Sequence, residues 1–277
     1  MTPQTRIARL FDSLKRNGRK GLIAYLTAGD PTPERTPSLV EALERGGADL
    51  IELGVPFSDP IADGPVIQRA GQRALAAGTT LRKVLGMAAE IRRRSDIPLL
   101  LFTYLNPVLR YGLDALALDA AACGMDGCLL TDASVEEAGQ YVEAMRRQGL
   151  DTVFLASPTS TERRLKLVAK YSTGFVYLVS RTGVTGARAS LSEAVGPLVT
   201  AMRAVTDLPL AVGFGVSRPE QVAELGRQVE AVVVGSAIVD LIARNADNPS
   251  LEIQLESFVR ELKHGFALCA VTETPSS

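Results

Sequence analysis

The sequence predicts an α/β fold in which eight parallel strands, each followed by a helix, close into a (β/α)8 barrel. Eight short runs rich in Val, Ile and Leu recur along the 277 residues, and amphipathic stretches with a helical period lie between most of them. Near-continuous apolar strands that alternate with helices are typical of a parallel sheet buried on both faces. Eight such units in this length of chain favour a barrel. An open doubly wound sheet is the alternative, but no GxGxxG motif follows the first strand.

Most of the expected strands are separated by the length of one strand, one helix and two loops, roughly 30 residues. They cover 21–29, 48–56, 97–106, 125–132, 150–158, 173–180, 207–215 and 230–236. Two intervals between strand starts are longer, 49 residues after the second strand and 34 residues after the sixth. Enlarged loops of this kind are candidates for active-site lids.

The expected helices carry apolar residues at helical spacing, and several end at Gly, as a left-handed C-cap favours. They include 33–47, 80–94, 135–149, 161–172 and 217–229, and a short helix is expected after the last strand. The stretch 6–18 predicts an extra N-terminal helix that caps the N-terminal end of the barrel. We therefore expect a single TIM-barrel domain over residues 1–270, followed by a disordered polar tail over 271–277.

The composition excludes several classes of protein. The chain has 30 basic and 31 acidic side chains and a formal charge of -1, so it lacks the clustered positive charge that nucleic acids and anionic membranes attract. No run approaches the roughly 18 uncharged apolar residues of a membrane span, and the N-terminal segment lacks the apolar region of a signal peptide. We therefore expect a cytoplasmic protein that binds neither nucleic acid nor a membrane.

The scarcity of histidine restricts the chemistry. His264 is the single histidine, which excludes a His-rich metal site and argues against a nucleophile–His–acid triad. The three cysteines match no common zinc spacing and are too few for a disulfide framework. No metal site is expected, and any acid–base chemistry must come from carboxylates, Lys or Tyr.

Two carboxylates are the candidate acid–base residues. Alternation along the strand around Ile51-Glu52-Leu53 points Glu52 into the mouth of the barrel, where burial would raise its pKa toward neutrality. A structural ion pair is the alternative, but the expected strands contain no Lys or Arg. Asp63 lies in an Asp-Gly dipeptide that would also suit a simple turn. Its place in an enlarged loop just beyond Glu52 favours a functional role, since two carboxylates in different environments can supply an acid and a base.

Further candidates lie at the ends of the last three strands. Tyr177 is placed to donate a hydrogen bond to Glu52 across the barrel, and a core aromatic is the alternative. A phosphate site built from backbone amides and the helix N-terminus after the last strand is predicted at Gly186, Gly215, Gly235 and Ser236. The alternative is that these residues only form tight turns. The segment 181–186 is a glycine-containing, hydroxyl-bearing loop that would allow a hinge or a close approach to a ligand.

These segments resemble, in this order, the tryptophan synthase alpha chain family. The most specific match is ELGVPFSDPIADGPVIQRA at 52–70, and SRTGVTG at 180–186 and GFGVSRPEQV at 213–222 add independent support. The resemblance extends over the whole chain except its final tail. It implies retro-aldol cleavage of indole-3-glycerol phosphate to indole and glyceraldehyde 3-phosphate, with no cofactor in this chain.

The resemblance also implies roles for single residues. Glu52 would deliver a proton to indole C3 and help remove one from the side-chain hydroxyl, and Asp63 would accept the hydrogen bond from the ring nitrogen. The lid would be the loop from Arg181 to Ser190, with Thr185 orienting Asp63. The substrate pocket and the phosphate site are further implied to comprise Tyr25, Thr27, Phe102, Tyr104, Tyr177, Gly186, Gly215, Gly235 and Ser236. Tyr25 departs from the apolar aromatic residue expected at its position.

Members of the family associate with a beta chain that carries pyridoxal phosphate (PLP), so the resemblance implies an alpha2beta2 heterotetramer in which indole passes between sites without release. The loops after the second and sixth strands and the segment around Asp132 would face that partner. The sequence Asp132-Ala133-Ser134 lacks the Pro that the family usually has two residues after the Asp. A stand-alone lyase, a binding subunit that only activates its partner, and a barrel acting on another sugar phosphate are the alternatives.

Overall fold

The computed structural model describes residues 4–179, 191–213 and 215–270. Within them, eight parallel strands form a closed barrel in which each strand pairs with the next along the chain and the last pairs with the first. The predicted (β/α)8 barrel is confirmed, and the open doubly wound alternative is wrong. The strands are β1 (Gly21–Thr27), β2 (Leu50–Gly54), β3 (Leu99–Thr103), β4 (Gly127–Leu130), β5 (Asp151–Ala156), β6 (Val176–Val179), β7 (Leu210–Gly213) and β8 (Ala231–Val234).

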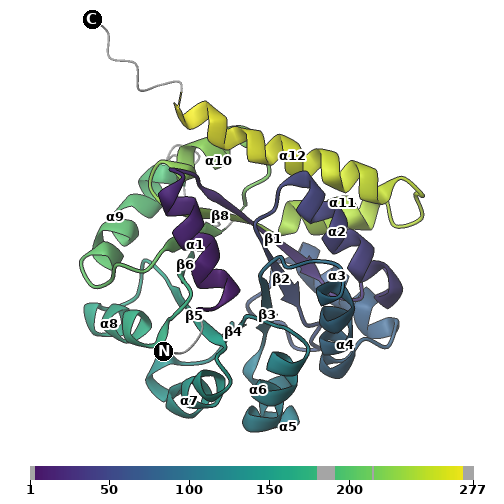
Figure 1. The fold of residues 1–277 in the computed structure, drawn as a ribbon, viewed down its shortest axis with the longest axis horizontal. Coiled ribbons are helices and arrows are strands. Elements are labelled where there is room, and N and C mark those ends of the chain that lie inside the picture. The colour runs from purple at the N-terminus through teal and green to yellow at the C-terminus, as the bar shows by residue number, and fades with distance from the viewer. Residues whose placement is uncertain (1–3, 180–190, 214, 271–277) are drawn as a thin grey trace, which may run out of the picture.

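Helices surround the barrel, and the helix α1 lies across one end of it in Figure 1. The α-helices are α1 (Arg6–Arg16), α2 (Thr36–Gly46), α3 (Pro65–Ala76), α4 (Leu81–Arg92), α5 (Leu105–Tyr111), α6 (Leu113–Ala122), α7 (Gly139–Arg147), α8 (Glu162–Tyr171), α9 (Leu191–Arg203), α10 (Pro219–Gly226), α11 (Ser236–Arg244) and α12 (Leu251–Ala270). Two single 3-10 turns, η1 (Pro33–Arg35) and η2 (Val135–Glu137), precede α2 and α7. None of the helices within the described ranges combines the length and apolar character needed to cross a bilayer.

The structure corrects several expected elements. The long interval after β2 contains two helices, α3 and α4, of which only α4 was expected. The ranges of α5, α6, α9 and α12 were not among those named from the sequence, although a helix was expected after each strand. The predicted helices 33–47 and 135–149 each begin with a 3-10 turn. The expected strand 97–106 ends at Thr103, and α5 begins at Leu105. There the Leu105 N–H donates to the Asp132 carboxylate at 2.7 Å, a contact between distant segments that favours a helix start. The predicted tail 271–277 lies outside the described residues.

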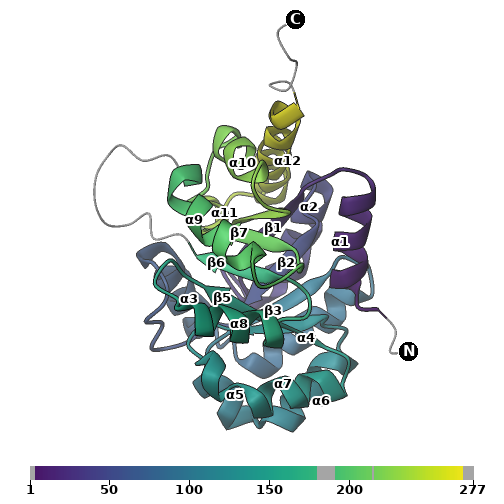
Figure 2. The same cartoon turned by 90° about the vertical axis from the view of Figure 1, so that its left-hand side faces the viewer.

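Apolar side chains fill the lower part of the barrel, where the strands begin. Inward-pointing strand residues form one buried cluster with α1, which contributes Ile7, Phe11 and Leu14. The Phe11 and Phe175 ring centroids lie 5.6 Å apart. The predicted N-terminal helix that caps this end is therefore confirmed (Figures 1 and 2). Because this end is packed solid, space for a ligand remains only toward the carboxyl ends of the strands.

A second apolar layer lies between the outer faces of the strands and the helices. It includes Cys128 of β4, which is 1% exposed, as expected for a core thiol. Strand residues that alternate between the two layers explain why the strands read as nearly continuous apolar runs. The few polar side chains that point inward are therefore exceptions to the packing, and they mark the candidate site.

Replacing Phe11 with Ala should lower the free energy of unfolding by about 3–5 kcal/mol, because it leaves a cavity in the inner cluster that α1 closes. Denaturant unfolding of the full chain measures the change. Lys15→Ala, which alters an exposed residue of the same helix, is the matched control and should stay within about 0.5 kcal/mol of the parent. Equal stabilities for the two variants would contradict the proposed role of α1.

Candidate active site

A cavity of about 440 Å³ opens at the carboxyl ends of the barrel strands. Eight of the residues singled out in the sequence line it, and two more, Thr27 and Tyr104, contact lining residues through their hydroxyl groups. The eight are Tyr25, Glu52, Asp63, Phe102, Tyr177, Gly215, Gly235 and Ser236. Thr185, Gly186 and the expected lid 181–190 lie outside the described residues. The barrel therefore brings most of the predicted site together in one place.

Glu52 lies in the middle of β2, with Tyr25 of β1 and Leu100 of β3 as its partners in the neighbouring strands. Its side chain points inward and the residue is 1% exposed. Neither carboxyl oxygen has a hydrogen-bond partner among the described residues. Burial raises the pKa of Glu52 to about 8, because the charged form has lost its hydration and nothing replaces it. Glu52 is therefore mostly protonated at neutral pH.

Asp63 lies in the loop between β2 and α3, where its backbone N–H donates to the Pro60 carbonyl at 3.0 Å. Partial burial raises the pKa of Asp63 to about 6, and a hydrogen bond from the Tyr104 hydroxyl opposes this shift. Asp63 is thus mostly ionised at a pH where Glu52 still holds its proton. One cavity contains a neutral carboxylic acid and a carboxylate, which is the arrangement needed for paired acid and base chemistry.

Tyr104 supports the loop that carries Asp63. Its hydroxyl oxygen accepts a hydrogen bond from the Ala62 N–H at 3.1 Å, and its ring lies 5.1 Å from that of Phe57. Burial and the nearby Asp63 carboxylate raise the pKa of Tyr104, so the phenol stays neutral and keeps its proton for donation. Tyr104 is not among the residues that line the cavity, so it contacts the site through Asp63.

Two tyrosines line the cavity. Tyr25 packs edge-on against Phe102, with ring centroids 5.1 Å apart, and its hydroxyl lies 3.4 Å from the Thr27 hydroxyl. Tyr177 does not make the predicted hydrogen bond to Glu52, because no described residue bonds the Glu52 oxygens. Its hydroxyl instead lies over Gly213 of the neighbouring strand, where an added Cβ would overlap it. The phenol is therefore directed along the sheet rather than across the barrel.

The far end of the cavity is formed by backbone rather than by charged side chains. Gly215 has a φ of 67°, a left-handed conformation that glycine adopts without strain. Gly235 is the N-cap of α11, and Ser236 is the first residue of that helix. A helix N-terminus that faces a cavity presents free N–H groups and a partial positive charge to an anion. This wall can bind a phosphate without a Lys or Arg.

Several lining residues were missed in the sequence. Val66 and Ile67 come from α3, a helix that was not expected, so no pattern identified them. Four other lining residues lie two positions after an inward-pointing strand residue, so strand alternation could have identified them. They are Thr131, Leu155, Val179 and Val233. They give the cavity a mainly apolar wall that suits an aromatic ring.

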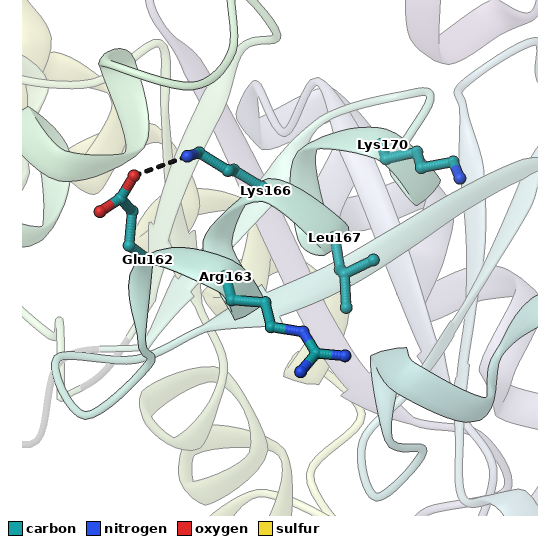
Figure 3. A pocket seen from close by; sticks show the side chains of 5 residues that line it. All are labelled: Glu162, Arg163, Lys166, Leu167 and Lys170. Atoms are coloured by element: carbon teal, nitrogen blue, oxygen red, sulfur yellow. Dashed lines mark hydrogen bonds and ion pairs between the residues drawn. The ribbon is translucent and has the colours of Figure 1, made fainter.

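A second hollow lies on the outer surface of α8 and is lined by Glu162, Arg163, Lys166, Leu167 and Lys170 (Figure 3). The Lys166 ammonium pairs with the Glu162 carboxylate at 2.6 Å, and both side chains are largely exposed. Water solvates these charges, and no buried polar group faces the hollow, so it offers no comparable chemistry. Within the described ranges, no group of three or more His, Cys, Asp or Glu side chains is arranged to hold a metal ion.

Comparison with known sequences identifies similar proteins over nearly the whole chain. A family model described as tryptophan synthase alpha chain matches residues 11–267. The tryptophan synthase alpha chain of Solibacter usitatus is 77% identical over 262 residues, which cover 95% of this chain and 98% of that relative. The corresponding chain of Geobacter sulfurreducens is 50% identical over 240 residues, which cover 87% and 91% of the two chains.

Solved structures show the same similarity. Tryptophan synthase subunit alpha from Legionella pneumophila matches with a TM-score of 0.89 at 35% identity, over 96% of this chain and 100% of that chain. A chain of the tryptophan synthase a2b2 complex from Pyrococcus furiosus matches with a TM-score of 0.81 at 42% identity, over 87% and 97% of the two chains.

The environment of Glu52 predicts how stability depends on pH. The unfolded chain loses the Glu52 proton near the ordinary pKa of 4.5, whereas the folded chain keeps it up to about pH 8. The contribution of this group to the free energy of unfolding therefore falls as pH rises from about 4.5 to 8. Glu52→Gln should remove this loss and be more stable than the parent at pH 9 by about 1–4 kcal/mol. Urea unfolding across this pH range measures it, with the exposed Glu137→Gln as control. Parallel profiles for the parent and Glu52→Gln would contradict the assignment.

Proposed function

We infer the function from one premise: the chain belongs to the tryptophan synthase alpha chain family. Its activity is the lyase reaction of that family, the cleavage of indole-3-glycerol phosphate. The observation that supports this function best is the placement of a neutral Glu52 and an ionised Asp63 in one cavity with an anion-binding wall. The products are indole and glyceraldehyde 3-phosphate, and the proposed site requires no cofactor of its own.

Glu52 carries both proton transfers in the proposed mechanism. Its carboxylic acid gives a proton to C3 of the indole ring, which leaves a cationic indolenine-like intermediate and a carboxylate. That carboxylate then removes the proton from the hydroxyl on the carbon attached to C3. As the C3 side-chain bond breaks, its electron pair returns to the ring, and the hydroxyl carbon becomes the aldehyde. Glu52 ends the cycle protonated, which is the state that its burial favours.

Asp63 stabilises the intermediate. Its carboxylate accepts the hydrogen bond from the ring N–H, and its negative charge offsets the positive charge that develops on the ring. The apolar wall formed by Phe102, Leu155 and Val179 excludes water around the ring and strengthens this interaction. We assign Tyr25 and Tyr177 to the same ring pocket, Thr27 to the support of Tyr25, and Tyr104 to the support of Asp63.

The phosphate of the substrate is assigned to the wall formed by Gly215, Gly235 and Ser236, together with Gly186. Backbone amides and the N-terminus of α11 would hold its negative charge. We further propose that the loop 181–190 closes over the substrate and that Thr185 orients Asp63. One catalytic domain, residues 1–270, would then contain every group that the reaction needs.

We propose that the chain binds a tryptophan synthase beta chain in the cytoplasm, as an alpha2beta2 heterotetramer, and passes indole to it. The Pyrococcus furiosus structure, an a2b2 complex, supports this proposal. The partner would carry PLP and join indole to L-serine, giving L-tryptophan. On the face toward the partner, Asp132 accepts a hydrogen bond from the Leu105 N–H at 2.7 Å, and the Ser134 hydroxyl donates to Glu136 at 2.6 Å. These bonds hold the loop that lacks the usual Pro.

Glu52→Gln should lower the rate of indole release by at least about a thousandfold, because the amide cannot move a proton. Asp63→Asn should cause a large loss by removing the charge that stabilises the intermediate. Indole release from indole-3-glycerol phosphate, with and without beta chain, measures both effects. Glu137→Gln is the control and should keep the parental rate. A Glu52→Gln enzyme with near-parental turnover would exclude the mechanism. If the parent releases no indole, whether beta chain is present or absent, the lyase function is excluded.

Tyr104→Phe should change the pH profile of indole release. Its hydroxyl lowers the pKa of Asp63, so removing it should raise that pKa and shift the acidic limb of kcat/KM to higher pH. The loss of activity should therefore be larger at pH 5.5 than at pH 8. Profiles that superimpose after scaling would show that Tyr104 does not act through Asp63.

A further inference from the structure

An ion pair with a buried carboxylate and a partly exposed guanidinium lies outside the cavity and joins two segments that form its wall. The Asp30 carboxylate, which follows β1, is 2% exposed and accepts two hydrogen bonds from the Arg73 guanidinium of α3, at 2.7 and 2.8 Å. Neither residue lines the cavity. Two parallel bonds between a guanidinium and a carboxylate fix both distance and orientation. The pair therefore restrains α3 relative to the end of β1, in addition to the packing of the buried face of the helix.

On the strand side, Asp30 belongs to a turn that is continuous with the ring pocket. Its N–H donates to the Thr27 carbonyl at 3.2 Å, and the Thr27 hydroxyl in turn lies 3.4 Å from that of Tyr25. The neighbouring Gly29 N–H donates to the Thr36 hydroxyl at 2.9 Å. This turn is thus a fixed point to which Arg73 can anchor the helix.

On the helix side, α3 is attached directly to Asp63. The Gln68 side-chain amide donates to the Asp63 carbonyl oxygen at 2.9 Å, and the Gln68 N–H donates to the Gly64 carbonyl at 3.0 Å. Gly64 is the N-cap of α3 and supplies no side-chain capping bond. The loop before it projects from the barrel, with Ile61 84% exposed. The position of Asp63 therefore depends on where α3 is held.

We propose that Arg73 and Asp30 are positioning residues for Asp63, acting through α3 and Gln68 to hold the carboxylate at the ring nitrogen of the substrate. This proposal rests on the proposed function, in which Asp63 stabilises the cationic intermediate. A side chain displaced by about 1 Å can cost on the order of a hundredfold in rate, so a helix anchor outside the cavity can control catalysis. Looser placement would also expose Asp63 to water and lower its raised pKa toward the ordinary value.

Arg73→Lys tests the proposal, because it keeps the positive charge beside Asp30 but cannot form the two parallel bonds. Arg69→Lys is the matched control, since Arg69 is an exposed residue of the same helix. We expect Arg73→Lys to lower kcat for indole release about ten- to a hundredfold and to shift the acidic limb of its pH profile to lower pH. Arg69→Lys should match the parent in both. Circular dichroism and the Tm establish that each variant is folded.

A second variant removes the buried charge together with its partner. Asp30→Asn combined with Arg73→Gln leaves no unpaired ion inside the protein, so it tests the pair even if Arg73→Lys folds poorly. The double variant should also lose kcat and shift the acidic limb. A folded variant with a lower Tm but the parental kcat and pH profile would overturn the proposal, because it would show a purely structural role.

Asp63→Asn, measured in the same series, distinguishes a failure of the positioning role from a failure of the proposed function. If Asp63→Asn is inactive while Arg73→Lys and the double variant behave like the parent, the positioning role is wrong and the proposed function stands. If Asp63→Asn itself keeps the parental rate, the proposed function of Asp63 fails and the positioning role fails with it. Loss of activity in all three variants, with the pH shift in the two ion-pair variants, supports both.

Discussion

The site depends on one constraint: a carboxyl group is enclosed in a barrel that offers it neither water nor a partner. Closure of the eight strands buries Glu52, and α1 packs the opposite end so that solvent cannot reach it from below. The residues described around the cavity include no Lys or Arg that could stabilise the charge. The neutral acid is therefore a consequence of the fold. The proposed mechanism needs a group that gives a proton and takes it back, and the pKa of Glu52 lies near the pH at which a carboxyl group can do both.

The rest of the cavity complements this acid. Asp63 is in a loop rather than a strand, so it keeps more contact with water and a hydrogen bond from Tyr104, and it ionises at a lower pH than Glu52. Apolar strand ends surround the space for a ring, and the N-terminus of α11 supplies positive potential where a phosphate would lie. An acidic substrate thus requires no basic patch, which is consistent with the near-neutral charge of the chain.

Local pattern was enough to predict the barrel and to place Glu52, because strand periodicity decides which side chains face inward. The local pattern predicted the wrong structure or contact where contacts between distant segments decide the outcome. The run 97–106 looks like one strand, yet the Asp132 carboxylate binds the Leu105 N–H and a helix begins there. Tyr177 was expected to bond Glu52, but the space over Gly213 directs its hydroxyl elsewhere. The Asp30–Arg73 pair joins residues 43 positions apart, and nothing in either segment reveals it. Helix α3 and its lining residues lie in the long interval after β2, which was expected to be an enlarged loop before the helix 80–94.

The protonation state of Glu52 in the resting enzyme is the most direct test of whether the barrel encloses a neutral acid. Carbon-13 NMR of the full chain labelled at the glutamate side-chain carboxyl carbon, with Glu52→Gln to assign the resonance, would follow this one group across pH. A titration midpoint near pH 8 is the predicted result, since burial without a partner raises the pKa of Glu52 to about 8. A midpoint near the ordinary value of 4.5 would contradict it, because the enclosed carboxyl would then be ionised at neutral pH and could not begin the reaction as an acid.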